Sequence, residues 1–267
     1  MLFKKLIRTI GQYKAQFISM IVMIAIGIGI FVGFNTEWYT IEKNTKSFFS
    51  DCKLSDYKIA DVASSGFSEE DVEKIKAVDG VDAATLYFSV NAEVEEKEGT
   101  QVALDVAKTR GVSEFVVIKG EKYDPSSTDG IWLSETYANK NGVKLGDELT
   151  FSYGDTKIKG VVKAFIKAAE HMVCVRDESQ LMPDYTTYGY AYASSALYES
   201  KSSSALYKYI YVRSNIGSDS FKEKVNAVFG KTMLVTTKNE NVSYSQSKGE
   251  IEEGQTMGSI LPVVFLI

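Results

Sequence analysis

The sequence predicts an α+β extracytoplasmic domain with two lobes, carried on an N-terminal transmembrane helix. Three observations predict this fold class. Residues 15–36 hold no charged side chain, β-α-β patterns occur at 57–98 and 207–237, and the region 100–206 between them is rich in strands. Because the two flanking patterns can complete one sheet, we expect them to form a split α+β lobe. The middle region is then inserted into it as a β-rich lobe.

The stretch 15–36 is expected to be an uncleaved membrane anchor. A helix rises about 1.5 Å per residue, so about 20 residues cross the hydrocarbon core of a bilayer, and this stretch has 22. A cleaved signal peptide is the alternative, because a basic start followed by an apolar run fits both. The apolar part of a signal peptide usually has about 7–15 residues and ends in small ones. Here the run is longer and ends in Phe34-Asn35-Thr36-Glu37-Trp38, which favours the anchor.

Charge predicts how the anchor is oriented. Residues 1–14 carry no acidic side chain and four basic ones, Lys4, Lys5, Arg8 and Lys14. The whole chain has a net charge of −5, so residues 15–267 have a net charge of −9, which is −5 minus the +4 of the first fourteen residues. Since basic flanks stay in the cytoplasm, we expect a cytoplasmic N-terminus and an extracytoplasmic main domain at the cell (plasma) membrane. Trp38 and Tyr39 would lie at the outer head groups.

The first fourteen residues also follow a helical pattern. Apolar side chains occur at helical spacing between the basic ones, and they are Leu2, Phe3, Leu6, Ile7 and Ile10. This pattern predicts a basic amphipathic helix over residues 1–14 on the inner membrane surface, with membrane lipid as its partner. A positively charged flank without such a helix fits the same residues.

The first half of the α+β lobe has clear local signals. Tyr57–Ala60 is predicted to be a strand. Ser68 suits the N-cap of a helix, with Asp71 approximating the capping-box partner. Leu86–Val94 alternates apolar and polar side chains, which is typical of a half-buried strand.

The second half repeats this order near the other end of the domain. It has a strand at Tyr207–Arg213, a helix capped by Ser218 that ends at Gly230, and a strand at Met233–Thr237. The helices of both halves are expected to cover a single face of one sheet.

The middle region is predicted to consist of short strands joined by turns. Extended runs are expected at 102–106, 115–118 and 131–133, followed by a brief helix over 134–141. Alternating side chains over 149–166, interrupted by a Gly-Asp turn, predict a hairpin.

The end of the chain is expected to return to the membrane. Residues 238–256 are polar and predict a second stalk, and residues 257–267 are apolar and predict the start of a second transmembrane helix. With a helical stalk after the anchor as well, the extracytoplasmic core domain is expected at 37–256. Eleven helical residues reach only about 16 Å, about half a bilayer, so we expect the chain to be a fragment of a longer protein.

Three segments resemble one family. The first is Lys14-Ala15-Gln16-Phe17-Ile18 running into Ile26-Gly27-Ile28-Gly29-Ile30-Phe31-Val32-Gly33-Phe34. The second is Ile131-Trp132-Leu133-Ser134-Glu135-Thr136-Tyr137-Ala138 with Gly142-Val143-Lys144-Leu145-Gly146-Asp147-Glu148-Leu149, and the third is Leu261-Pro262 to Phe265-Leu266. Together they are similar to the N-terminal part of an FtsX/MacB-type ABC transporter permease.

The resemblance implies a membrane subunit that works with partners. Such permeases typically have four or more spans, pair with a second permease subunit as a homo- or heterodimer, and bind a cytoplasmic ABC ATPase. It implies that the exported domain couples ATP hydrolysis by that partner to substrate expulsion or extracytoplasmic mechanotransmission. This chain departs from the pattern by lacking the later spans and the cytoplasmic loop that would contact the ATPase.

Catalytic signatures are absent from the sequence, so we expect no enzyme activity, no cofactor and no metal. There is no G-x-x-x-x-G-K-[ST] phosphate loop, and the glycines at 27 and 29 lie inside the apolar span. His171 is the single histidine, and its neighbour Cys174 alone gives neither a catalytic pair nor a metal site. The acidic exported domain makes nucleic acid an unsuitable partner.

Two groups of residues are candidates for specific contacts. Ala25, Gly29 and Gly33 are spaced by four, which puts small side chains on one helix face where another membrane helix can pack closely. Cys52 and Cys174 are compatible with one disulfide and equally with two isolated thiols.

One alternative function fits the same layout. A membrane-tethered extracytoplasmic sensor or ligand-binding domain would also have two spans around an exported domain, but would continue into a cytoplasmic signalling module. Tyrosines at 185, 188, 190 and 192 suit a ligand groove, although ordinary strand or loop packing is favoured for them.

Overall fold

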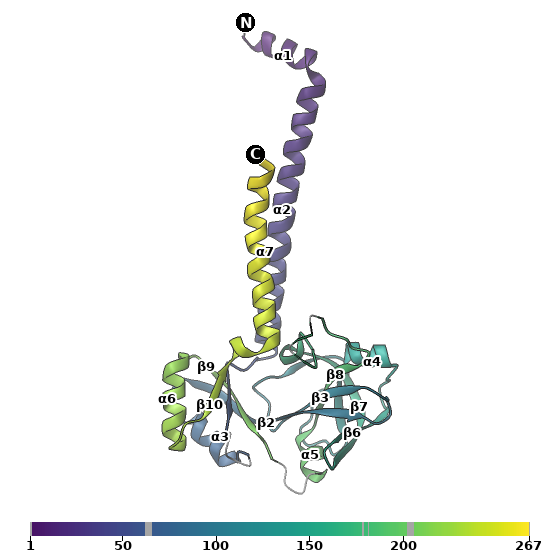
Figure 1. Cartoon of the computed structure of the whole chain (residues 1–267), viewed down its shortest axis with the longest axis vertical. Helices are drawn as coiled ribbons and strands as arrows, with labels where there is room; N and C mark the ends of the chain where they lie inside the picture. Colours follow the sequence, from purple (N-terminus) through teal and green to yellow (C-terminus); the bar gives the residue numbers. More distant parts are fainter. Residues whose placement is uncertain (1, 62–65, 178, 181, 202–205, 267) are drawn as a thin grey trace. The chain divides into compact units, whose positions relative to one another are not determined.

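The structure, a computed structural model, describes the chain except residues 1, 62–65, 178, 181, 202–205 and 267. It also leaves out the side chains at 2, 3, 6 and 261–266. The chain divides into two compact units (Figure 1). One comprises Met1–Lys46 and Ser247–Ile267, and the other is Ser47–Gln246.

The first unit is helical. Helix α1 (Leu2–Gln12) covers the predicted basic helix, α2 (Lys14–Asp51) contains the predicted anchor and stalk, and α7 (Val242–Leu266) runs through the predicted second stalk and span. Among the described residues, α2 is the one helix long and apolar enough to cross a membrane. The best window in α2 has a mean hydropathy of 2.6 and is not buried at all. A core helix of a soluble protein would be buried, so lipid is the natural cover for this surface.

Some predictions for this unit fall outside the described part. The side chains of Leu2, Phe3 and Leu6 are not described, whereas Ile7 and Ile10 are exposed. The side chains of Leu261-Pro262 to Phe265-Leu266 are likewise not described. The membrane-surface position of 1–14 and the span boundaries at 15–36 and 257–267 stay predictions.

The second unit is built on one sheet, with ten strands in the described part of the chain. Its strands are β1 (Tyr57–Ala60), β2 (Val81–Val94), β3 (Gln101–Ala107), β4 (Phe115–Gly120), β5 (Gly130–Ser134), β6 (Glu148–Tyr153), β7 (Thr156–Ala168), β8 (Tyr188–Ala193), β9 (Tyr209–Ser214) and β10 (Leu234–Thr237). Its helices are α3 (Glu69–Lys76), α4 (Glu135–Asn141), α5 (Ser195–Lys201) and α6 (Ser218–Phe229), with 3-10 turns η1 (Ala169–His171) and η2 (Lys238–Glu240).

The α+β lobe is the part of this sheet with the order β10-β1-β9-β2, in which every neighbouring pair is antiparallel. Each β-α-β unit is therefore split, with a strand of the other unit between its own two strands. Helices α3 and α6 bury Val72, Ile75, Phe221 and Val225 in the same cluster as Ile59 of β1. The prediction of one sheet with helices on a single face is confirmed.

Local signals place α3 where the sequence predicts it. The Ser68 Oγ accepts a hydrogen bond from the Asp71 backbone N–H at 3.3 Å, and the Asp71 carboxylate accepts one from the Ser68 backbone N–H at 2.9 Å. The predicted capping box is thus formed. For α6 the prediction was wrong at the cap: Gly217 holds the N-cap position without a side-chain hydrogen bond, and Ser218 is the first helical residue.

The β-rich lobe is a closed ring of strand pairings. Strands β2, β3, β8, β5 and β7 follow one another, and β6 pairs with both β7 and β2, while β4 pairs with the outer side of β7. Figure 1 shows α4 and α5 with these strands and α3 and α6 with β9 and β10.

Strand β2 belongs to both lobes. Its first half, Val81–Tyr87, pairs with β9, and its second half pairs with β3. It therefore begins five residues earlier than the strand predicted from alternation at Leu86. Alternation fails there because Ala84–Phe88 are buried on both faces of the strand, with Leu86 in one core cluster and Tyr87 in another.

Candidate functional site

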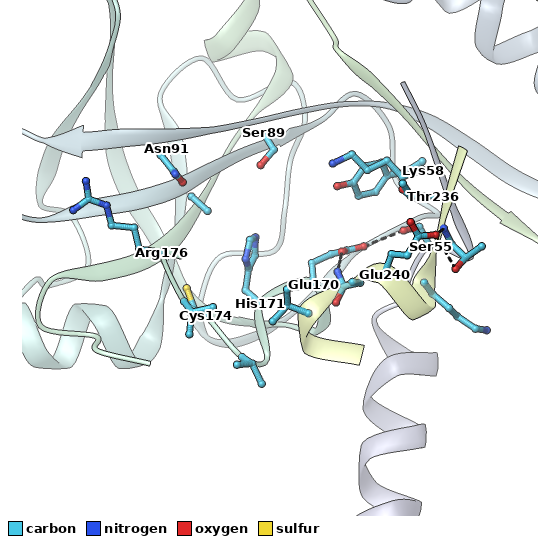
Figure 2. Close-up of a pocket in the computed structure, with 18 of the residues that line it drawn as sticks. Ser55, Lys58, Ser89, Asn91, Glu170, His171, Cys174, Arg176, Thr236 and Glu240 are labelled. Carbon is cyan, nitrogen blue, oxygen red and sulfur yellow. Dashed lines mark hydrogen bonds between the residues drawn. The ribbon is translucent and has the colours of Figure 1, made fainter. Parts of the chain in front are cut away.

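The helix-free face of the α+β lobe carries a cavity of about 440 Å³. Successive side chains of a strand point to opposite faces. Thus Ile59 faces the helices, and Lys58 faces the cavity. The segment that follows β7 and the segment that precedes α7 complete its lining (Figure 2). The site therefore lies where the chain enters and leaves the domain.

Glu170 links these segments through hydrogen bonds. Its carboxylate accepts hydrogen bonds from the Ser55 hydroxyl at 3.1 Å, from the Ser113 hydroxyl, and from the Asn241 side-chain amide at 2.7 Å. Its backbone carbonyl accepts a hydrogen bond from the Ser243 hydroxyl at 3.0 Å. We call these five residues the Glu170 junction.

The Glu170 junction connects the β-rich lobe to the ends of α2 and α7 that belong to the second unit. Ser55 lies four residues after the end of α2, Asn241 directly precedes α7, and Ser243 is in its first turn. Glu170 itself follows β7, which pairs with β4, β5 and β6. Burial raises the pKa of the Glu170 carboxyl above its ordinary value, although the hydrogen bond from Ser113 acts in the opposite direction.

Apolar packing reinforces the Glu170 junction. Phe49 at the end of α2 and Leu54 after it are buried against Ala169, the residue before Glu170. Tyr244 of α7 packs against the same cluster, with its ring centroid 5.3 Å from that of Phe49. Both helix ends therefore meet the same 3-10 turn.

His171 lies beside Glu170 and extends the polar network into the sheet. Its Nε2 is 2.6 Å from Oδ2 of Asp105 in β3, and the Tyr87 hydroxyl donates to that same oxygen at 2.7 Å. Asp105 is 1% exposed, and its other oxygen has no hydrogen-bond partner among the described residues. Burial alone would lower the pKa of His171, but the attraction of Asp105 outweighs it, so the pKa is raised.

The two cysteines are free thiols in separate clusters. Cys52 is buried beside Ala169, and Cys174 is buried among the tyrosines around Tyr188. Of the two alternatives that the sequence leaves open, the structure has the isolated thiols, and no disulfide joins Cys52 to Cys174. Burial raises the pKa of Cys52 to about 11 and that of Cys174 to about 12.

The predicted helix-packing residues lie away from this site. Ala25, Gly29 and Gly33 are exposed on α2, and a Cβ built on Gly29 or Gly33 would meet nothing within 4 Å in the described part of the chain. The face is open, and its partner stays a prediction.

Glu170, Asp105 and Lys58 were not predicted from the sequence to be site residues. Asp105 had a signal, because it is the only charged residue in the apolar run 102–106. Glu170 had no signal in the sequence beyond its position next to the single histidine. Of the tyrosines considered, Tyr188 lines the cavity, while Tyr190 and Tyr192 are core residues. Among the residues that the structure describes, no group of three or more His, Cys, Asp or Glu could hold a metal ion.

Comparison with known families identifies the class of protein. Residues 17–228 match the model of the MacB-like periplasmic core domain. This match covers most of the chain, so the chain belongs to that family, whose members are components of ABC transporter permeases. The resemblance drawn from the sequence is confirmed, and the protein is a membrane protein with an extracytoplasmic domain.

Two solved structures are similar to the chain. The extracellular domain of the noncanonic ABC-type transporter YknZ from Gram-positive bacteria is 14% identical, with 68% of this chain and all of that domain covered and a TM-score of 0.46. The periplasmic region of MacB from Actinobacillus actinomycetemcomitans is 11% identical, with 76% and 95% covered and a TM-score of 0.43. Comparison with curated proteins gave no match.

Proposed function

We propose that this chain is part of an ABC transporter permease subunit whose exported domain is coupled to ATP hydrolysis by a cytoplasmic ABC ATPase. The coupling would serve substrate expulsion or mechanotransmission outside the cytoplasm. The single observation that carries the proposal is the Glu170 junction, because one half-buried residue, Glu170, accepts hydrogen bonds from both the segment after α2 and the start of α7. Family membership supports the ATPase partner.

The path of force within the domain follows from the contacts of Glu170. A displacement of either helix end pulls on the turn at 169–171, because its hydrogen bonds and apolar contacts hold both ends. That turn directly follows β7, a strand of 13 residues that pairs with three other strands. A packed sheet deforms little, so the displacement moves these strands together.

The orientation and the domain boundaries belong to the same proposal. The net charge of +4 on 1–14 and of −9 on the rest supports a cytoplasmic N-terminus, with 15–36 crossing the plasma membrane and 37–256 outside. We further propose that Ala25, Gly29 and Gly33 pack against a helix of a second permease subunit. The open space at Gly29 and Gly33 supports this.

A purification experiment tests the proposal. The full-length protein, tagged and extracted from its native membrane in mild detergent, is expected to co-purify with an ATPase that hydrolyses ATP in the preparation. Purification with a histidine kinase or another signalling protein, and without an ATPase, would support the membrane-tethered sensor instead. The cavity beside the Glu170 junction is the one observation that favours that second candidate.

A further inference from the structure

We propose that the cavity on the helix-free face binds a small organic carboxylate, with Lys58 as its counter-ion. At about 440 Å³ the cavity has the size of a small-molecule site, which ranges over about 300–1,000 Å³. The inference concerns binding by the domain alone and goes beyond the proposed coupling to an ATPase.

Lys58 is a cation without a carboxylate partner in the described part of the chain. Its Nζ lies 3.8 Å from the ring centroid of Tyr209 and 5.9 Å from that of Tyr211, so aromatic faces hold it in place. Burial lowers the pKa of this amine, which reflects the cost of keeping the charge out of water. A bound anion would offset that cost.

The acidic side chains of the lining are already engaged. Glu170 accepts three hydrogen bonds in the Glu170 junction, and Glu240 accepts from the backbone N–H of Thr237 at 2.9 Å. The basic Lys238 of the lining pairs with Asp56 at 2.8 Å. These hydrogen bonds occupy oxygens of the two carboxylates without neutralising their charge, and the group left for a ligand at this end of the described lining is the Lys58 ammonium.

Neutral donors face the same space. Ser89 and Asn91 are two residues apart on β2 and point into the cavity (Figure 2). The Ser89 hydroxyl forms no hydrogen bond with any residue that the structure describes, and Asn91 uses its carbonyl to accept from the Tyr188 hydroxyl at 2.6 Å. The Ser89 hydroxyl and the Asn91 amide N–H groups are thus available to ligand oxygens.

This donor set matches a carboxylate better than a phosphate. Phosphate sites combine several cationic or backbone donors around a group of charge near −2. Figure 2 shows Lys58 and Arg176 on opposite sides of the cavity, so a single ammonium group meets the anion at the Lys58 end. One ammonium group with hydroxyl and amide donors suits a single negative charge, and the tyrosine rings suit a short carbon skeleton.

Isothermal titration of the full chain in detergent micelles tests the proposal, with acetate, succinate, L-glutamate and inorganic phosphate as probes. We expect saturable binding of at least one carboxylate, weakened at least tenfold by Lys58→Met and partly restored by Lys58→Arg. Ser89→Ala should weaken it about two- to tenfold, as loss of one hydrogen bond does. Lys222→Met, which removes an exposed lysine of α6, should leave it unchanged.

Three results would overturn the proposal: no carboxylate binds, phosphate alone binds, or a cooperatively folded Lys58→Met protein binds as well as the unaltered chain. None of these bears on co-purification with an ATPase, so failure here is distinguishable from failure of the proposed function.

Discussion

Gly254 of α7 packs directly against the indole of Trp38 of α2. A Cβ added at Gly254 would lie closer to three indole carbons than the 3.0 Å that real Cβ atoms keep, so only hydrogen fits there. The Gln255 side-chain amide, next along α7, donates a hydrogen bond to the Glu42 carboxylate of α2 at 2.7 Å. Within the first unit, the two long helices are thus in close apolar contact at Gly254 and in polar contact at Gln255.

Substitution of the α7 glycines should show this contact. Replacing a glycine inside a helix by alanine stabilises the helix by about 1 kcal/mol, so Gly249→Ala, with nothing within 4 Å, should raise the thermal midpoint of the purified protein. Gly254→Ala should lower it and shift the Trp38 emission, because the new methyl group displaces the indole. Equal behaviour of the two variants would show that the helices do not meet at Trp38.

Removal of the Glu170 carboxylate should destabilise the exported domain. Glu170→Ala leaves the donors of Ser55, Ser113 and Asn241 without their acceptor, and an unsatisfied buried polar group costs about 1–3 kcal/mol. Glu170→Gln keeps one acceptor oxygen and should cost less. Urea unfolding monitored by circular dichroism gives the free energies. Glu223→Ala on the exposed face of α6 is the control, and a Glu170→Ala protein as stable as this control would show that these hydrogen bonds do not stabilise the domain.

The His171–Asp105 pair should make stability depend on pH. The pKa of His171 is raised from 6.5 in the folded state by Asp105, so its stabilising contribution is complete below pH 6.5. That contribution is lost as the pH rises through the raised value. The pKa of the Glu170 carboxyl is also raised in the folded state, so the contribution of Glu170 to stability also falls as the pH rises, beginning at a lower pH.

Thermal midpoints of the unaltered chain and of His171→Gln, measured between pH 6 and 9, check this dependence. The difference between the two proteins should be largest at pH 6 and should shrink as the pH rises. A difference that is constant, or that grows with pH, would show that His171 is not charged by its contact with Asp105.

The cysteines should be unreactive until the domain opens. Both are buried, and with a pKa of about 11 for Cys52 and about 12 for Cys174 very little thiolate, the reactive form, exists at pH 8. In intact cells, a membrane-impermeant maleimide should label neither thiol before mild unfolding and at least one after it. Labelling that requires cell lysis would place the domain in the cytoplasm and reverse the proposed orientation.

Sequence reasoning succeeded where the signal is local. The capping box of Ser68 and Asp71, the strand at Tyr57–Ala60 and the glycine end of α6 depend on neighbours in the chain, and the structure has all three. It failed at the N-cap of α6, because residue preferences for caps are statistical. Serine is a common N-cap residue, so Ser218 was predicted in place of Gly217.

The Glu170 junction could not have been predicted in this way. Ser55 and Asn241 are 115 and 71 residues from Glu170 in sequence, and their contact depends on how β7 ends against the helix-free face. The sharing of β2 between the two lobes could not have been predicted either, because it depends on which strands β2 pairs with and not on the residue pattern within β2.

We propose that the Glu170 junction carries movement from the helices to the exported domain. Spin labels at Lys140→Cys on α4 and Lys222→Cys on α6, both exposed, report the distance between the lobes in the transporter purified with its ATPase. We expect this distance to change between the nucleotide-free and ATP-bound states in the otherwise unaltered protein and in Glu223→Ala, and to stay fixed in Glu170→Ala. An equal change in Glu170→Ala, or no change in any of the three, would contradict the claim.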